Sequence, residues 1–475
     1  MLQTASEACT RVTQLVLAVI LTLALMAAGT AGSTPAAQFL LLSDIHFNPM
    51  ADPHLVDRLA AGPPAEWPAI LDASADKSLG RYGADTNWRL LHSALEQTGA
   101  ALPHPTFVLI TGDFLAHHFR DQFNAAARDH SDPAFRGFVD KTMRFLALEI
   151  EVVFPNTPIL PALGNNDEVC GDFELEPGGP FLTDTLPVMR GLVGGRADRD
   201  FERDWKRYGN YSVTVPGVRG VRLIFANTVF FSRRYRNTCG AAGGDDPGRA
   251  TLAWLEAELM AAKRAHQRVW LAFHVPPGID GFATWRQGAC PDRIIPMWAD
   301  AYAQPVYALL RRYADTVAAA FAGHTHMDDF RLIGDAKGNF AFALITPAVS
   351  PIFGQNPAFR TVTYDSAGGI LDQATYDLTN LSETDADTPP KWRLEYTFTA
   401  DWRLPRVDLA SLERLHAMIT TVPEDRALWR TLFPVSSLVY WTQNHGGADE
   451  TRAYECAEGH VSVADYRQCW CGGVK

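Results

Sequence analysis

Five short apolar runs punctuate this 475-residue chain, and each ends abruptly in polar residues that can bind metal. The runs occupy residues 39–42, 107–110, 159–163, 269–273 and 317–321. Runs of this length are typical of buried strands. Helical patterns lie between them at residues 87–97, where Thr86 is the expected cap, and at 135–149 and 250–266. Strands alternating with helices predict an α/β core whose binding residues sit at the strand ends.

The polar residues at these strand ends are imidazole, carboxylate and amide groups. In chain order the segments are Ser43-Asp44-Ile45-His46, Gly112-Asp113, Gly164-Asn165-Asn166-Asp167, His274 and Gly323-His324-Thr325-His326. Alternate residues of an extended segment face the same side, so Asp44 with His46, and His324 with His326, can address one cavity. Imidazole and carboxylate together suit zinc, manganese or iron. One such residue alone is more often a surface residue, but seven at five successive strand ends predict a metal site.

The ordered blocks Asp44-x-His46, Gly112-Asp113, Gly164-Asn165-Asn166-Asp167, His274 and Gly323-His324-x-His326 resemble the calcineurin-like metallophosphoesterase superfamily. The resemblance implies a two-sheet αββα sandwich. It also implies two divalent metal ions, with zinc favoured and manganese or iron as alternatives. The first metal would be bound by Asp44, His46, Asp113 and His326. The second would be bound by Asp113, Asn165, His274 and His324, so that Asp113 bridges the pair.

Three further stretches are similar to the acid sphingomyelinase-like phosphodiesterases, namely residues 80–86 (GRYGADT), 112–117 (GDFLAH) and, more loosely, 396–405 (YTFTADWRLP). Where the family usually has Gly-Asn-His, this chain has Asn166, as in the fungal endopolyphosphatase branch. Asparagine can donate a hydrogen bond to a substrate phosphate but cannot supply a proton. His117, four residues after Asp113, is therefore the candidate general acid, and its neighbour His118 is expected to face solvent.

These features predict a phosphodiesterase that hydrolyses a small, nucleotide or lipid-linked phosphodiester with metal-activated hydroxide. A polyphosphatase or phosphomonoesterase on the same scaffold is the alternative. A catalytically silent binding protein is a third reading, which the complete ligand set disfavours. The formal charge of −12 argues against a nucleic-acid polymer as partner. Peripheral contact with a membrane and the oligomeric state stay open at this point.

The N-terminal residues combine Arg11, an apolar run at 15–28 and small residues that end near Ala31. This pattern predicts a signal peptide at residues 1–31 and hence an exported protein, with an uncleaved anchor as the alternative. We expect a catalytic domain at residues 36–377. A change of composition after Asp377 predicts a smaller, mainly helical region at residues 391–475, with helices at 412–419 and 424–432.

Six cysteines follow the apolar N-terminal run: Cys170, Cys239, Cys290, Cys456, Cys469 and Cys471. An even number of cysteines in an exported chain predicts disulfides, and we expect Cys456 to pair with Cys469 or Cys471. The chain also has a basic cluster of Arg233, Arg234 and Arg236. It is either a binding surface for an anionic part of the substrate or a solvated loop.

Overall fold

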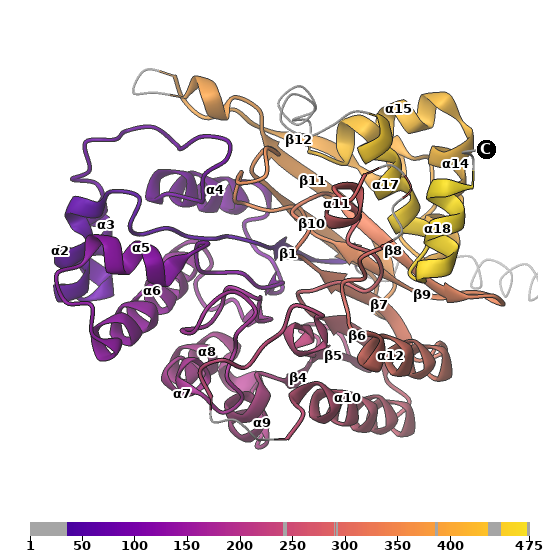
Figure 1. Ribbon diagram of the computed structural model, residues 1–475, viewed down its shortest axis with the longest axis horizontal. Helices are drawn as coiled ribbons and strands as arrows, with labels where there is room; N and C mark the ends of the chain where they lie inside the picture. The colour runs from indigo at the N-terminus through magenta and orange to yellow at the C-terminus, as the bar shows by residue number, and fades with distance from the viewer. Residues whose placement is uncertain are drawn as a thin grey trace, which may run out of the picture. The chain divides into compact units, whose positions relative to one another are not determined.

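The apolar runs predicted to be strands are found as strands of two six-stranded sheets (Figure 1). The computed structural model describes residues 36–240, 245–288, 290, 293–384, 388–435 and 448–472. The first sheet has the strand order β12 (Trp392–Thr397), β11 (Ile370–Leu378), β10 (Ala358–Tyr364), β1 (Ala37–Leu42), β2 (Val108–Ile110) and β3 (Ile159–Pro161). Strands β1, β2 and β3 run parallel, whereas the pairs on the other side of β1 are antiparallel. The carboxyl ends of β1, β2 and β3 therefore meet at one edge.

The second sheet differs from the first, because its parallel strands lie at the centre and both of its edge strands are antiparallel. Its order is β4 (Tyr211–Thr214), β5 (Val221–Phe225), β6 (Arg268–Ala272), β7 (Val317–Ala322), β9 (Gly338–Ile345) and β8 (Asp329–Asp335). Strands β5, β6, β7 and β9 are parallel, and β4 and β8 are the antiparallel edge strands. The ends of β6 and β7, which carry the predicted histidines, are thus neighbours.

Aromatic side chains pack the two sheets against each other. The ring of Phe39 in β1 lies 5.7 Å from the ring of Trp270 in β6 and 5.5 Å from the ring of Phe321 in β7. Tyr364 in β10 lies 5.2 Å from the same Trp270. All four residues are buried. Rings from both inner faces interdigitate, which is the packing of a β-sandwich.

Helices cover the sandwich from outside. They are α2 (Val56–Ala61), α3 (Trp67–Leu71), α4 (Trp88–Ala101), α5 (Phe119–Ala126), α6 (Asp132–Val153), α7 (Pro180–Asp184), α8 (Leu186–Val193), α9 (Phe201–Tyr208), α10 (Pro247–Arg264), α11 (Gly281–Trp285), α12 (Asp300–Arg312), α13 (Phe398–Asp401), α14 (Leu409–Thr421), α15 (Pro423–Leu432), α17 (Ala448–Gly459) and α18 (Val463–Cys471). Short 3-10 turns are η1 (Pro53–Leu55), η2 (Pro64–Glu66), η3 (Gly194–Arg196), η4 (Thr228–Phe231) and η5 (Leu381–Glu383). Helices α4 and α8 contact the first sheet, and α10 and α12 contact the second. The predicted αββα sandwich is confirmed.

The predicted helices at 87–97, 135–149 and 250–266 correspond to α4, α6 and α10, each with different ends. The expected cap of α4 was wrong, because Asn87 rather than Thr86 accepts the hydrogen bond from the backbone N–H of Leu90, at 2.9 Å. The backbone of Thr86 is instead paired with that of His46, whose carbonyl accepts from Thr86 N at 3.1 Å. This long-range pairing keeps Thr86 extended and moves the start of the helix by one residue.

The C-terminal region begins with a strand before its helices. Strand β12 is hydrogen-bonded to β11, and the helices predicted at 412–419 and 424–432 are found as α14 and α15. Helices α14 and α17 pack on the β8–β9 edge of the second sheet. A disulfide joins Cys456 of α17 to Cys469 of α18, as predicted, and a second joins Cys170 to Cys239. The domain division near Asp377 remains a prediction.

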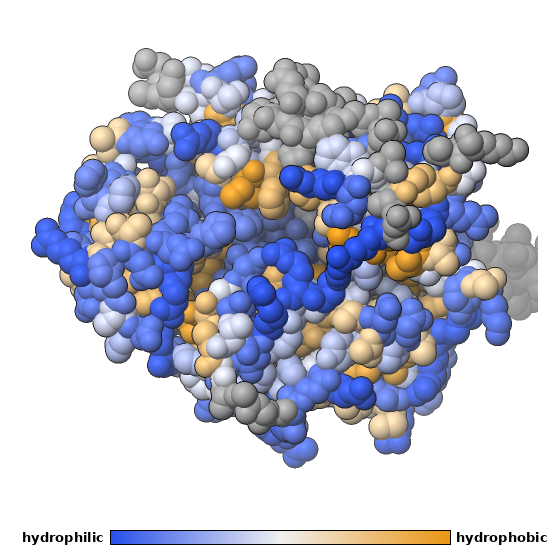
Figure 2. Space-filling model, in the orientation of Figure 1, coloured by the Kyte–Doolittle hydropathy of each residue, from blue (hydrophilic) through white to orange (hydrophobic). Residues whose placement is uncertain are grey.

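The predicted signal peptide at residues 1–31 lies outside the described residues. Among the helices that the structure describes, none combines the length and the apolar character needed to cross a bilayer. Hydrophilic residues predominate on the face shown in Figure 2, and hydrophobic residues are scattered over it.

Candidate metal centre

The seven predicted metal ligands converge between the two sheets. The first sheet contributes Asp44 and His46 after β1, Asp113 after β2 and Asn165 after β3; the second contributes His274 after β6 and His324 and His326 after β7. Hydrogen bonds across the gap hold the two sets together. The His274 Nδ1–H group donates to the carbonyl of Thr111 at 2.8 Å, and the backbone N–H of His324 donates to Asp44 at 3.0 Å.

Five of these residues have a left-handed backbone that side-chain-bearing residues seldom adopt. The φ angles are 48° at Asp44, 42° at His46, 58° at Asp113, 76° at His324 and 66° at His326. Backbone hydrogen bonds hold them there, as from Asp44 N to Gly112 O at 3.0 Å and from His46 N to Asp113 O at 2.9 Å. Strained conformations of this kind collect at functional sites, where the surrounding structure maintains them.

Glycine before the ligands permits close approach of the strand ends. A Cβ atom on Gly164 would lie 2.0 Å from Asp113 Oδ1, and one on Gly323 would lie 2.1 Å from Ser43 Oγ. Neither contact is sterically possible. Any larger residue at either position would therefore push the metal-binding loops apart.

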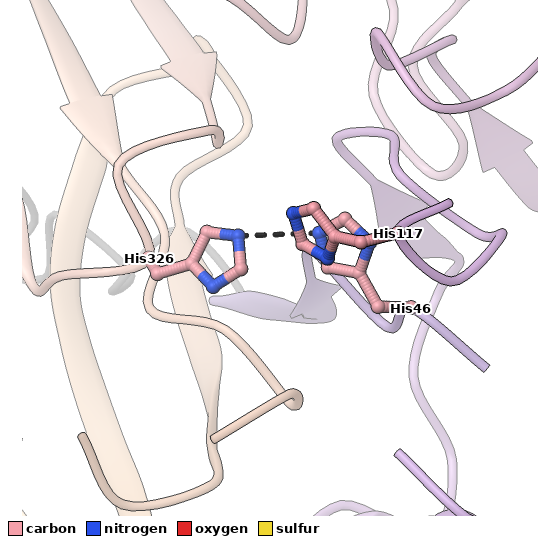
Figure 3. Close-up of side chains that lie close together, drawn as sticks. All are labelled: His46, His117 and His326. Carbon is pink, nitrogen blue, oxygen red and sulfur yellow. Dashed lines mark hydrogen bonds between the residues drawn. The ribbon is translucent and has the colours of Figure 1, made fainter. Parts of the chain in front are cut away.

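The first group of possible metal-binding atoms consists of one ring nitrogen from each of His46, His117 and His326. These nitrogens lie within 4.8 Å of one another (Figure 3). The Nδ1–H of His46 donates to the carbonyl of Leu115 at 2.9 Å, so Nε2 carries the lone pair in the neutral ring. That atom lies 3.2 Å from His326 Nε2 and 3.3 Å from Asp113 Oδ2. Burial and the nearby His117 lower the pKa of His46 to about 4, which keeps the ring neutral. The lone pair of His46 Nε2 and the carboxylate of Asp113 would repel each other, and a cation bound by both would remove this repulsion.

A second group consists of Asp44, Asp113 and His274, again with ligand atoms within 4.8 Å. Asp113 Oδ2 lies 3.2 Å from His274 Nε2, and it is the same oxygen that lies near His46. Asp113 therefore occupies the position between the groups that a bridging ligand requires. Burial opposes a charge on His274, but the carboxylates of Asp113 and Asp44 outweigh it and raise the pKa of His274 to about 9. The two buried carboxylates, Asp44 and Asp113, are stabilised by positive charge nearby, which a metal ion would supply.

Asn165 turns its amide oxygen toward the second group. Its Nδ2 donates to Asp172 Oδ1 at 2.7 Å, which leaves Oδ1 to face His274 Nε2 at 3.0 Å. An amide oxygen is a suitable metal ligand, whereas an amide nitrogen is not. Asp172 thus fixes which amide atom of Asn165 faces His274, and metal binding by Asn165 remains a prediction.

His324 lies at the open side of the second group. Its ring centroid is 5.2 Å from that of His274, and the edge of Phe173 packs against it at 5.7 Å. Burial, followed by the positive charge that His274 carries without a metal, lowers the pKa of His324 to about 3. The ring is therefore neutral and able to coordinate a metal, and its assignment as a ligand remains a prediction.

His117 is positioned by a carboxylate that the sequence pattern did not single out. Its Nδ1 lies 3.0 Å from Asp85 Oδ1, and its backbone N–H donates to Asp85 Oδ2 at 2.9 Å. The ring stacks on His46 with centroids 4.1 Å apart. Burial alone would lower the pKa of His117, but the hydrogen bond and charge of Asp85 raise it above the usual value. By contrast, His118 is 81% exposed and faces solvent.

Asn166 is turned toward Asp113. Its backbone N–H donates to Asp113 Oδ1 at 2.8 Å, and its Nδ2 donates to Asp113 Oδ2 at 2.9 Å. The amide therefore holds the bridging carboxylate in this arrangement. A direct contact of Asn166 with a substrate phosphate remains a prediction.

Asp167 ties the loops after β2 and β3 together, a role that nothing in its local sequence reveals. Its carboxylate accepts from the backbone N–H groups of Asp113 at 2.9 Å, Phe114 at 2.7 Å and Gly164 at 2.8 Å. Burial and the charge of Asp113 raise the pKa of Asp167 to about 7. Its partner Asp113 lies 54 positions away in the sequence.

The predicted basic cluster borders the loop that carries Asn165. Arg234 forms an ion pair with Asp172 at 2.7 Å, and its guanidinium lies over the ring of Phe173 at 4.4 Å. The Cys170–Cys239 disulfide joins the same two loops. Arg234 thus stabilises the loop that orients Asn165, whether or not the cluster also binds an anion.

Comparison with known proteins agrees with this geometry. The calcineurin-like phosphoesterase family matches residues 37–328, and the chain belongs to this family. It is a metal-dependent phosphoric ester hydrolase, and the predicted resemblance to the acid sphingomyelinase-like branch is confirmed. The family fold implies a pair of divalent metal ions, which the two groups of buried ligand atoms fit.

Individual relatives cover most of the chain. Acid sphingomyelinase-like phosphodiesterase 3b of Homo sapiens is 27% identical, covering 91% of this chain and 90% of that protein. Sphingomyelinase phosphodiesterase D of Dictyostelium discoideum is 26% identical over 76% and 80%, and the human cyclic GMP-AMP phosphodiesterase SMPDL3A is 25% identical over 83% and 82%. A solved dimetal phosphatase from Danio rerio aligns with a TM-score of 0.39 and 15% identity, covering 71% of this chain and 95% of that one.

Proposed function

We propose that this protein is an exported phosphodiesterase that hydrolyses a small, nucleotide or lipid-linked phosphodiester at a dinuclear metal centre. The position of Asp113 Oδ2 carries the proposal, because this oxygen lies within 3.3 Å of His46 Nε2 and 3.2 Å of His274 Nε2. A carboxylate oxygen that lies between two sets of donor atoms can serve two metals at once. Zinc suits the mixture of imidazole and carboxylate ligands.

Two bound metals would supply hydroxide at neutral pH and positive charge for the phosphate oxygens. Asp44, His46, Asp113 and His326 would hold one, and Asp113, Asn165, His274 and His324 the other. Asp172 accepts from the Nδ2 of Asn165, which would leave the amide oxygen free to bind the second metal. Asn166 holds Asp113 in place and is near enough to donate to a phosphate if that hydrogen bond is exchanged.

His117 would donate the proton that the leaving alcohol needs. Asp85 accepts from Nδ1, so Nε2 of the protonated ring is the donor left for substrate. The raised pKa of His117 favours the protonated ring that a general acid requires. A metal nearby would oppose this charge, so the Asp85 carboxylate is the group that maintains the acid.

Action on polyphosphate or a phosphomonoester is the second candidate. It is favoured by Asn166, which stands where phosphodiesterase relatives usually have a histidine. A leaving phosphate is already a stable anion and needs an acid less than an alkoxide does. The two candidates therefore differ in how strongly turnover should depend on His117.

Export is supported by the cysteines. The disulfides Cys170–Cys239 and Cys456–Cys469 are compatible with an oxidising compartment outside the cytosol. The candidate sites of action are the extracellular space, the periplasm or a lysosome-like compartment, depending on the organism.

The test is metal content and turnover of the purified protein. We expect about two equivalents of divalent metal per chain and hydrolysis of bis(4-nitrophenyl) phosphate that stops when a chelator removes the metal. A panel of sphingomyelin, cyclic GMP-AMP, nucleoside triphosphates and polyphosphate would then identify the substrate class. Full activity after complete metal removal would contradict the proposal, and preference for polyphosphate would favour the second candidate.

A further inference from the structure

A partly exposed aromatic ring lies beside two of the histidines of the candidate metal centre. Phe353 is 38% exposed and is the one aromatic residue among the exposed large hydrophobic residues in the described part of the chain. Its ring centroid lies 4.6 Å from that of His326 and 5.9 Å from that of His117, and in both pairs the rings meet edge to face. The ring therefore adjoins both a predicted metal ligand and the candidate acid.

The loop that carries Phe353 is anchored on both sides of the ring. Before it, the backbone N–H of Ser350 donates to the carbonyl of Asp44 at 3.1 Å. After it, Gln355 Nε2 donates back to the carbonyl of Ser350 at 2.6 Å, and Gly354 N donates to Pro351 O at 3.1 Å. Gly354 has a φ of 93°, which suits glycine at this turn. The anchoring holds the ring in position before any substrate arrives.

An apolar ring left partly in water beside a reactive centre is well placed to contact substrate. The leaving oxygen must come within hydrogen-bond reach of His117 to receive a proton. The carbon atoms attached to that oxygen then start within the surroundings of Phe353. Aromatic rings gain both from burial of apolar area and from face or edge contact with other planar groups.

We propose that Phe353 is a specificity-determining residue that forms an apolar wall for the leaving alcohol. The enzyme should accordingly prefer diesters whose leaving alcohol has an apolar or aromatic group next to the ester oxygen. This inference rests on the proposed phosphodiesterase function and goes beyond it by naming the side of the site that selects the alcohol.

The test compares two methyl phosphate diesters, one of ethanol and one of 2-phenylethanol. Both alcohols are poor leaving groups that need a proton, so the contribution of His117 is similar for the two. Phe353→Ala should lower kcat/KM about tenfold for the phenylethyl ester, mainly by raising KM. A tenfold change corresponds to about 1.4 kcal/mol. For the ethyl ester, the same substitution should lower kcat/KM by less than about twofold. Phe353→Leu should retain most of the preference.

Leu394→Ala is the matched control, since Leu394 is 50% exposed on the edge strand β12 of the first sheet. It should change neither rate. Equal losses on both esters, or no loss on either, in Phe353→Ala would overturn the inference. Absence of turnover by the metal-loaded wild type on every diester would instead reject the proposed function.

A binding measurement tests the role of Phe353 even if the protein hydrolyses none of the diesters. Calorimetry with the ethyl and 2-phenylethyl esters of methylphosphonate should show tighter binding of the phenylethyl ester by the wild type. Phe353→Ala should remove that difference without weakening the ethyl ester. Equal affinity of the wild type for the two phosphonates would exclude an apolar wall at this position.

Discussion

Asp113 Oδ2 lies between the two groups of donor atoms, and the surrounding residues are arranged to keep it there. Asn166 donates to both of its oxygens, and Asp167 accepts from its backbone N–H. The pKa of Asp113 lies well below its usual value, because the positive charge of His274 and the hydrogen bonds from His274 and Asn166 outweigh the effect of burial. Asp113 is therefore an anion held in place from several directions.

Replacement of Asp113 by alanine should impair binding of both metals, since one carboxylate serves both groups. We expect kcat/KM to fall by several orders of magnitude and metal content to fall below two equivalents, with circular dichroism unchanged. Asp121→Ala is the control, because Asp121 is 82% exposed near His118. A variant at 113 that kept two equivalents of metal and normal turnover would refute the bridging assignment.

His117 is expected to matter in proportion to the need of the leaving group for a proton. His117→Ala should slow alkyl phosphodiesters about 100-fold or more and a nitrophenyl ester much less. Polyphosphate should fall between these. His118→Ala should have little effect, since that side chain faces solvent. If all leaving groups lost rate equally, His117 would be orienting substrate or metal, and the proton would come from another group.

At the scale of elements, α17 docks on β8 through buried charges. Asp329 and Arg331 of β8 form a fully buried ion pair at 2.5 Å, and Glu458 of α17 is hydrogen-bonded to Asp329. Trp429 of α15 donates to Glu458 Oε1 at 2.7 Å. Burial, followed by the negative charge of Asp329, raises the pKa of Glu458 well above its usual value. The folded protein therefore binds a proton at Glu458 more tightly than the unfolded chain does.

This proton makes the stability of the fold depend on pH. The pKa of Glu458 is higher in the folded than in the unfolded chain. The contribution of Glu458 to the free energy of unfolding is therefore fully present below about pH 4.5, and it is lost as the pH rises through the pKa of the folded state. Glu458→Gln mimics the protonated form. It should raise Tm above that of the wild type at pH 8, with the gain shrinking toward pH 4.5. Glu424→Gln, on the exposed side of α15, should shift Tm at neither pH.

The disulfide between α17 and α18 closes a short loop, with a sequence separation of 13 residues. The chain-entropy estimate for a loop of this size is about 3 kcal/mol. Cys469→Ser should reduce the free energy of unfolding by roughly that amount, as measured in urea under non-reducing conditions. Cys471→Ser should have a smaller effect, because Cys471 has no disulfide. Peptide mapping that found Cys456 and Cys469 as free thiols would remove the basis of this prediction.

At the scale of the whole molecule, the metal centre joins the two sheets. Asp44, Asp113 and Asn165 follow strands of the first sheet, whereas His274, His324 and His326 follow strands of the second. Metal that binds the folded state but not the unfolded chain stabilises the fold by mass action, by about 4 kcal/mol at 1,000 times the dissociation constant. The centre is thus expected to support the sandwich as well as catalysis.

Chelation should therefore lower Tm, and zinc should restore it. Calorimetric scans with and without a chelator would measure the shift. Asp113→Ala should show a much smaller metal-dependent shift than the wild type at the same free zinc concentration. A wild-type Tm that did not respond to metal would mean that the sandwich is held by its aromatic core alone.

Local sequence was enough to predict the five strands that precede the candidate ligands, and three of the long helices that cover the sheets. A short apolar run that breaks off in polar residues marks a buried strand and its end, and both are local properties of the chain. The ends of parallel neighbours must meet, so Asp44 and Asp113 could be assigned to one site without coordinates. His274 follows a strand of the other sheet, and it was grouped with them through the resemblance to the family. The pairing of Cys456 was also predictable, because its partner is near in sequence.

Only the tertiary structure decided which atoms face one another inside that site. The contacts of His117 with Asp85, of Asn166 with Asp113 and of Phe353 with His326 join residues whose proximity no periodic pattern encodes. The pairing of β12 with β11, within a region expected to be mainly helical, likewise depended on a free sheet edge. The spacing of hydrophobic and polar residues along the sequence predicts which face of a helix or strand is buried. Side-chain partners depend instead on how separate elements pack, and packing is a property of the whole chain.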